Sequence, residues 1–172
     1  VKKLSGGMVR RLGVAQALVH APQVLIVDEP TVGLDPEERL RFRQLMASLG
    51  QDRIIVLSTH IVADLGSGCS DLALIDHGEV VFRGSPSELL SRAKGKVYSL
   101  MIRPEEEASA TAGMEIVSRV SMGGEVRIRG VCDSGKPSAA ARPVDDPTLE
   151  EAYLVFMSAR GRAEAATTEV SS

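Results

Sequence analysis

Two adjacent carboxylates, Asp28 and Glu29, directly follow a short apolar run, Val24-Leu25-Ile26-Val27. A continuous apolar run of this length is typical of a strand that is buried on both faces. In an α/β sheet, ligands bind at the carboxyl ends of the strands. We therefore expect Asp28 to hold Mg²⁺ through water, and Glu29 to orient or deprotonate an attacking water. Taken alone, the segment also fits a strand that ends in an acidic turn.

A second candidate site lies near the start of the chain, where Leu4-Ser5-Gly6-Gly7 precedes a helical apolar pattern that begins at Met8. Glycines let a backbone approach a phosphate closely, and the free N–H groups and dipole of the following helix attract an anion. When these four residues are taken alone, a plain helix cap is the better interpretation.

Two further candidate segments lie at expected boundaries between strands and helices. Gly33-Leu34-Asp35-Pro36 predicts a helix with Asp35 as its cap and Pro36 at its first position. Ser58-Thr59-His60 follows a second apolar run, so a histidine there could touch the γ-phosphate of a nucleotide. For any lone example, a surface histidine at a strand end is the favoured interpretation.

The elements that must position these residues alternate between strand and helix from Ser5 to about Arg92, which predicts an α/β layer with a largely parallel sheet. The expected helices cover residues 8–19, 36–49, 61–65 and 87–90, and the expected strands cover residues 24–27, 54–57, 72–75 and 80–82. His77-Gly78 is a hairpin-turn signal between the last two of these strands.

The sequence changes in character after Lys94-Gly95, where we expect a small α+β domain. Its expected elements are strands over 97–102 and 125–128, a helical segment over 104–112, a linker over 134–143 and a final helix from 147–149. The expected domains are therefore 1–94 and 95–158, followed by a disordered tail over 159–172.

The charge balance excludes some partners. The chain has 20 basic and 23 acidic residues, a net charge of −3, which gives no long-range attraction to nucleic acid or anionic lipid. Cys69 and Cys132 have no metal-ligand spacing, so we expect a reduced, cytosolic chain. No apolar run approaches membrane-spanning length, so any work at a membrane is expected to go through a partner.

Together and in this order, the four segments resemble the ATP-binding cassette (ABC) family of ATPases. Leu4-Ser5-Gly6-Gly7 resembles the family signature, and the strand that ends in Asp28-Glu29 resembles its Walker B segment. Gly33-Leu34-Asp35 resembles the D-loop, and Thr59-His60 resembles the switch histidine. The stretch over 71–79 is similar to the hairpin that follows in transporters.

The resemblance implies a role for each matching residue. Asp28 would serve Mg²⁺, Glu29 would be the catalytic base, and His60 would sense the γ-phosphate. Asp35 would lie at a dimer interface. The signature residues Ser5, Gly6 and Gly7 would bind the γ-phosphate of ATP held by the opposite subunit, and Leu4 and Asp35 complete the expected nucleotide-binding set.

The resemblance also implies partners. Two such subunits would close two ATP molecules between them head to tail, and hydrolysis would reopen them. That cycle would drive a separate integral membrane subunit from the cytoplasmic face of the cell membrane, with no nucleic acid involved. Met8-Val9-Arg10-Arg11-Leu12 and the final segment from Pro147-Thr148-Leu149 are similar to the bacterial drug- and antibiotic-exporter branch.

The sequence departs from the family in one respect. No Gly-x-x-x-x-Gly-Lys-Ser/Thr segment, the Walker A loop that cradles the phosphates, occurs in it. The chain starts with Val1 inside a motif, so we expect it to be the C-terminal part of a longer subunit, inactive alone, with part of its apolar strand surface bare. Two alternatives are a non-catalytic truncated interaction module and an ABC-type ATPase of DNA maintenance, although the long coiled-coil arms of the latter are absent from this sequence.

Overall fold

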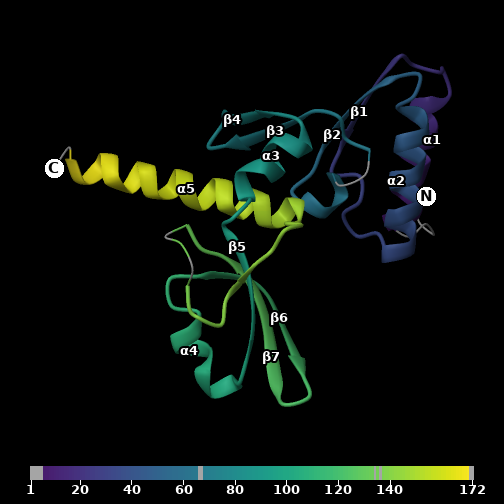
Figure 1. Ribbon diagram of the computed structural model, residues 1–172. Coiled ribbons are helices and arrows are strands. Elements are labelled where there is room, and N and C mark those ends of the chain that lie inside the picture. Colours follow the sequence, from purple (N-terminus) through teal and green to yellow (C-terminus); the bar gives the residue numbers. More distant parts are fainter. Residues whose placement is uncertain (1–5, 66–67, 134, 136, 171–172) are drawn as a thin grey trace. The chain divides into compact units, whose positions relative to one another are not determined.

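The computed structural model describes residues 6–65, 68–133, 135 and 137–170 (Figure 1). The chain forms two compact units, Val1–Ser70 and Asp71–Ser172. The sequence places the end of the first domain later, at residue 94, and that boundary stays a prediction. No helix in the described ranges combines the length and the apolar content that a membrane span requires.

The first unit alternates helix and strand. Its elements are α1 (Gly6–Leu18), β1 (Val24–Asp28), α2 (Pro36–Leu49), β2 (Ile54–Ser58) and the 3₁₀ helix η1 (Val62–Leu65). β1 and β2 pair in parallel, with Val24 opposite Ile54 and Asp28 opposite Ser58. The predicted parallel α/β layer is confirmed, and each element begins and ends within two residues of its predicted bounds.

Both long helices of the first unit pack on the same face of the β1–β2 pair. The core on this face consists of Leu25, Leu34, Phe42 and Met46, with Val14 and Leu18 of α1 packed against it. On the other face Ile26 is 74% exposed and Ile54 is 64% exposed. The prediction that both strands are buried on both faces is therefore wrong for this chain, whereas the expected bare apolar surface is found.

The second unit begins with a hairpin and continues into the smaller sheet. Its elements are β3 (Leu72–Asp76), β4 (Glu79–Gly84), α3 (Pro86–Ala93), β5 (Val97–Ile102), η2 (Pro104–Glu106), α4 (Glu107–Ala110), β6 (Glu115–Met122), β7 (Glu125–Val131), β8 (Arg142–Pro143) and α5 (Leu149–Val170). β3 and β4 form the predicted antiparallel hairpin. Its turn residues His77 and Gly78 have φ of 47° and 82°, as a tight hairpin turn requires.

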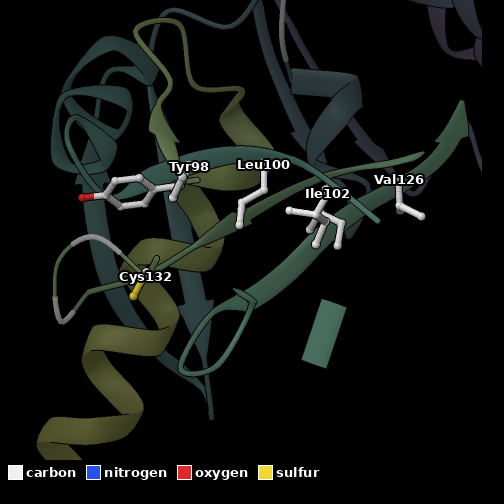
Figure 2. Close-up of a cluster of buried hydrophobic side chains, with 7 residues drawn as sticks. Tyr98, Leu100, Ile102, Val126 and Cys132 are labelled. Atoms are coloured by element: carbon white, nitrogen blue, oxygen red, sulfur yellow. The ribbon is translucent and has the colours of Figure 1, made fainter. Parts of the chain in front are cut away.

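The sheet of the second unit has the strand order β6-β7-β5-β8, and all its neighbouring strands are antiparallel. Its core is a cluster of seven buried side chains, which are Tyr98, Leu100, Ile102, Val126, Ile128, Cys132 and Ala141. Figure 2 shows this cluster and labels five of its members. This part of the chain is thus α+β, as predicted.

Two features of the second unit differ from the sequence prediction. β6 lies outside the sequence prediction; it is an edge strand whose side chains are mostly exposed, so it has no buried face. The predicted linker contains β8, which pairs with Tyr98 and Ser99 of β5. α5 extends to Val170, into the segment for which disorder is predicted, and that disorder stays a prediction.

Candidate functional site

The register of the two parallel strands brings the predicted catalytic residues to one edge of the sheet. Asp28 at the end of β1 lies opposite Ser58 at the end of β2. Glu29 and His60 follow these strands, and both therefore lie beyond the carboxyl edge, where ligands bind in α/β sheets. The backbone N–H of Glu29 donates a hydrogen bond to the carbonyl of Ser58, 3.0 Å away, which joins the two chain segments past the sheet.

Glu29 and His60 are in direct contact. Glu29 Oε1 accepts a hydrogen bond from the backbone N–H of His60, at 3.0 Å, and lies 2.7 Å from Nδ1 of its ring. The imidazole itself is 71% exposed, so the remainder of the ring is open to solvent. The other carboxylate oxygen, Glu29 Oε2, is buried and meets no hydrogen-bond partner within the described part of the chain. One oxygen is therefore held in place by His60, and the other is buried without a donor among the residues described.

The backbone at Glu29 adopts a conformation that side chains with a Cβ rarely take. Its φ is 45°, in the left-handed region. For an L-residue this conformation costs about 1–2 kcal/mol, because the Cβ approaches the following carbonyl oxygen. Strained residues of this kind cluster at active sites and ligand clamps. The strain thus falls on the residue to which the sequence assigns the catalytic base.

Asp28 provides an oxygen donor suited to a hard cation. Its residue is exposed, and its Oδ1 accepts a hydrogen bond from the hydroxyl of Ser58. Among the described residues there is no cluster of three or more His, Cys, Asp or Glu side chains that could hold a metal. Mg²⁺ is commonly bound by one or two carboxylates, together with water and substrate phosphates. The carboxylate of Asp28 beside the Ser58 hydroxyl fits that kind of site.

Asp35 is the cap of α2, as predicted. Its Oδ1 accepts a hydrogen bond from the backbone N–H of Glu38, at 2.8 Å, and Pro36 occupies the first helical turn. An aspartate in this position accepts a hydrogen bond from a backbone N–H at the helix N-terminus, and its negative charge is stabilised by the positive end of the helix dipole. This structural role is sufficient to account for Asp35 within the first unit.

Gly7 lies beside the same helix end. A Cβ at Gly7 would be 3.0 Å from Oε2 of Glu38 and 3.2 Å from Cδ2 of Leu34, so the close approach of α1 to α2 favours glycine. Arg11, one turn further along α1, forms an ion pair with Glu38. Gly6 is the first residue of α1, while Leu4 and Ser5 lie outside the described residues.

The predicted site residues therefore fall into two groups within the first unit. Asp28, Glu29 and His60 meet at the end of the parallel strands. Gly7 and Asp35 meet at Glu38 in the first turn of α2. The sequence gives no signal for Thr31 or Asp64, whose side chains are buried and hydrogen-bonded to each other in the segments that follow Glu29 and His60.

Comparisons with known proteins show which family the chain resembles. The family model described as "ABC transporter" matches residues 1–32. The Nod factor export ATP-binding protein I of Paraburkholderia xenovorans is 37% identical over 158 residues, which cover 91% of this chain and 50% of that protein. The chain belongs to the ATP-binding proteins of ABC transporters.

Other ABC relatives match in the same way. YxlF of Bacillus subtilis, named an ABC transporter ATP-binding protein, is 36% identical over 60% of this chain and 35% of its own length. Among solved structures, a bacterial Atm1-family ABC exporter with ATP bound is 28% identical, with a TM-score of 0.48, over 53% of this chain and 16% of that chain. The chain thus spans half or less of the length of these ABC proteins.

Proposed function

We propose that this chain is the C-terminal part of an ATP-hydrolysing subunit that drives an ABC export transporter. The observation that carries the proposal is the contact between Glu29 and His60 just beyond the carboxyl edge of the parallel strands. Neither a plain acidic turn nor a lone surface histidine would bring these two side chains together. Membership of the ABC ATP-binding proteins, several of which are named for export, supports the same function.

Glu29 is the proposed catalytic base. Its Oε1 is held by the two nitrogens of His60, which keeps the carboxylate beyond the carboxyl edge of the strands, where it would orient the attacking water. The exposed ring of His60 is the proposed contact to the γ-phosphate. In this arrangement the pairing with His60 keeps the Glu29 carboxylate at the reacting edge.

Asp28 is the residue that would hold Mg²⁺. Its exposed carboxylate, with the Ser58 hydroxyl beside it, fits a cation that takes oxygen ligands. When bound, Mg²⁺ would neutralise the negative charge that develops on the transferred phosphoryl group. This chain would thus place the carboxylate of Asp28 at the same edge of the sheet as the proposed base, Glu29.

The remaining predicted residues belong to the proposed assembly with partners. Leu4, Ser5, Gly6 and Gly7 would contact ATP held by a second ATPase subunit in a head-to-tail dimer, and Asp35 would lie at that interface. The dimer would act on an integral membrane transporter subunit from the cytoplasmic face. The position of Gly7 and Asp35 at one helix end supports a common role for the two segments.

We further propose that this chain alone does not turn over ATP. The Walker A segment supplies the backbone cradle and the lysine for the phosphates, and the 172 residues contain none. The paired Glu29 and His60 would then have no phosphate held beside them.

The test is ATP turnover by the isolated chain and by an ATPase subunit that joins it to a Walker A half. We expect background turnover from the chain alone, and at least a 100-fold loss in the joined subunit on Glu29→Gln, the usual effect of removing a general base. The exposed Glu37→Gln is the matched control and should change little. Equal turnover by Glu29→Gln and the parent subunit would overturn the role of Glu29.

A further inference from the structure

A buried hydrogen bond joins the segment that follows Glu29 to the segment that follows His60, two segments far apart in the sequence. The hydroxyl of Thr31 donates to Oδ2 of Asp64 over 2.5 Å. Thr31 is 1% exposed and the side chain of Asp64 is also 1% exposed. A buried carboxylate is stable only where it is paired or hydrogen-bonded, so this bond has a structural reason to persist.

The two partners lie close in sequence to the proposed catalytic residues. Thr31 comes two residues after Glu29, and Asp64 lies four residues after His60, in η1. The same two chain segments are therefore joined twice, once by the Thr31–Asp64 bond and once by the contact between Glu29 and His60. The Thr31–Asp64 bond holds in place both the segment after Glu29 and the segment after His60.

Asp64 also faces α2. Its Oδ1 lies 3.8 Å from Nε of Arg39, which is too long for a hydrogen bond, and both atoms are buried with no hydrogen-bond partner in the described ranges. The next turn of α2 reaches the same segment, because Arg43 donates to the carbonyl of Ala63 at 3.1 Å. α2 begins at the cap Asp35, and the backbone N–H of Arg39 donates to the carbonyl of Asp35. Asp64 is thus the point where α2 and both catalytic loops meet.

We infer that Asp64 is a positioning residue, which acts through Thr31 to hold the Glu29 loop against the His60 loop and ties both to α2. The inference rests on the proposed function, because it assigns Asp64 to the same reaction. Its physical basis is that loss of the Thr31–Asp64 bond leaves a buried carboxylate or hydroxyl unsatisfied, so the two loops separate. Their separation would break the hydrogen bond from the His60 backbone N–H to Glu29.

The test is amide hydrogen exchange at His60, measured by NMR on the full chain without nucleotide. In Thr31→Val and Asp64→Ala, each of which removes one partner of the Thr31–Asp64 bond, we expect exchange at the His60 amide to rise about tenfold, as loss of a buried hydrogen bond implies. Amides within β1 and β2 should keep their exchange rates. Thr31→Ser retains the hydroxyl and should restore slow exchange. Thr111→Val, which removes a hydroxyl bonded to Glu107 in the second unit, is the matched control.

Two results would overturn the inference: unchanged exchange at His60 in both variants, or equal acceleration of all amides of β1 and β2, which would mark a purely structural bond. Glu29→Ala serves as the positive control, because it removes the acceptor of the His60 amide. Since no nucleotide is present, this outcome is separate from the ATPase assay. Faster exchange at His60, together with full turnover by Glu29→Gln, would retain the positioning contact and refute the role of Glu29.

Discussion

Arg129 and Glu151 form a bidentate ion pair that joins the start of α5 to β7. The distances are 2.8 Å from Arg129 Nε to Glu151 Oε1 and 2.9 Å from Nη2 to Oε2. The carboxylate side chain is only 3% exposed, and Oε2 also accepts the backbone N–H of Thr148 at 2.8 Å. Because every donor in this arrangement is directed at one buried carboxylate, the second unit depends on the pair.

We therefore predict that Arg129→Met destabilises the second unit by about 3 kcal/mol, because it leaves Glu151 buried without its cation. The measurement is urea unfolding followed by tyrosine fluorescence. The chain has two tyrosines and no Trp, and both Tyr98 and Tyr153 lie in the second unit, so the signal reports that unit alone. The exposed neighbour Arg127→Met should change stability by less than about 0.5 kcal/mol.

The same pair predicts a dependence on acid pH. Burial acts to raise the pKa of Glu151, but the hydrogen bond from Arg129, the bonds from Thr148 and the charge of Arg129 outweigh it, and the pKa lies below the ordinary value of 4.5. The folded state thus binds the proton more weakly than the unfolded state does. The stability that the carboxylate contributes is fully present above about pH 4.5 and is lost as pH falls through the lowered pKa.

This dependence is measured by unfolding the parent chain and Glu151→Gln across the acid range with the tyrosine signal. The advantage of the parent chain should be constant near neutral pH and should shrink below pH 4.5. An advantage that persists unchanged at the lowest pH would show that the charge of Glu151 is not what stabilises the unit.

The exposed face of the β1–β2 pair predicts self-association of the isolated chain. Ile26 and Ile54 stand on this face at 74% and 64% exposure. Exposed apolar strand surface is an aggregation site, and threonine keeps the preference for strand while removing apolar area. The double variant Ile26→Thr/Ile54→Thr should lower light scattering while retaining its fold. Leu25→Ala, at a position 3% exposed on the core face, should instead cost about 3 kcal/mol and increase scattering.

The cap of α2 predicts that two substitutions of Asp35 will behave differently. Asparagine accepts the Glu38 amide as aspartate does, whereas alanine removes the acceptor at a cost of about 1 kcal/mol. Exchange of the Glu38 amide should thus rise about fivefold in Asp35→Ala and stay near the parent value in Asp35→Asn. If Asp35 also acts at a dimer interface, Asp35→Asn should weaken ATP-dependent dimerisation of the joined subunit despite its intact cap.

Much of the first unit could be predicted from local sequence, because its signals are local. Pro36 after Asp35 marks the start of a helix, and short apolar runs mark the two strands. The contact of Glu29 with His60 depends instead on the register between strands about 30 residues apart, which no local pattern encodes. The resemblance of Glu29 to the Walker B segment and of His60 to the switch histidine implies that both serve one site, but only the fold shows how they touch.

The parts that could not be predicted have physical causes. β6 is an edge strand with mostly exposed side chains, so its sequence need not alternate. Thr31 and Asp64 carry no local pattern of their own, and their pairing arises only when η1 packs behind the loop after β1. The exposure of Ile26 depends on which elements cover the sheet, and that is a property of the assembled domain.

The left-handed backbone of Glu29 yields a prediction whose sign can be checked. Both Glu29→Ala and Glu29→Gly remove the carboxylate, but only glycine has no Cβ to strain at a φ of 45°. Glycine should therefore be the more stable of the two by about 1 kcal/mol, measured by exchange of the slowest amides of β1 and β2. At the exposed helical position Gln44 of α2, the order should be reversed, with alanine better by about 1 kcal/mol. If alanine were the more stable variant at position 29 as well as at position 44, the backbone at Glu29 would not be strained. The strain would then give no support to an active-site role for Glu29.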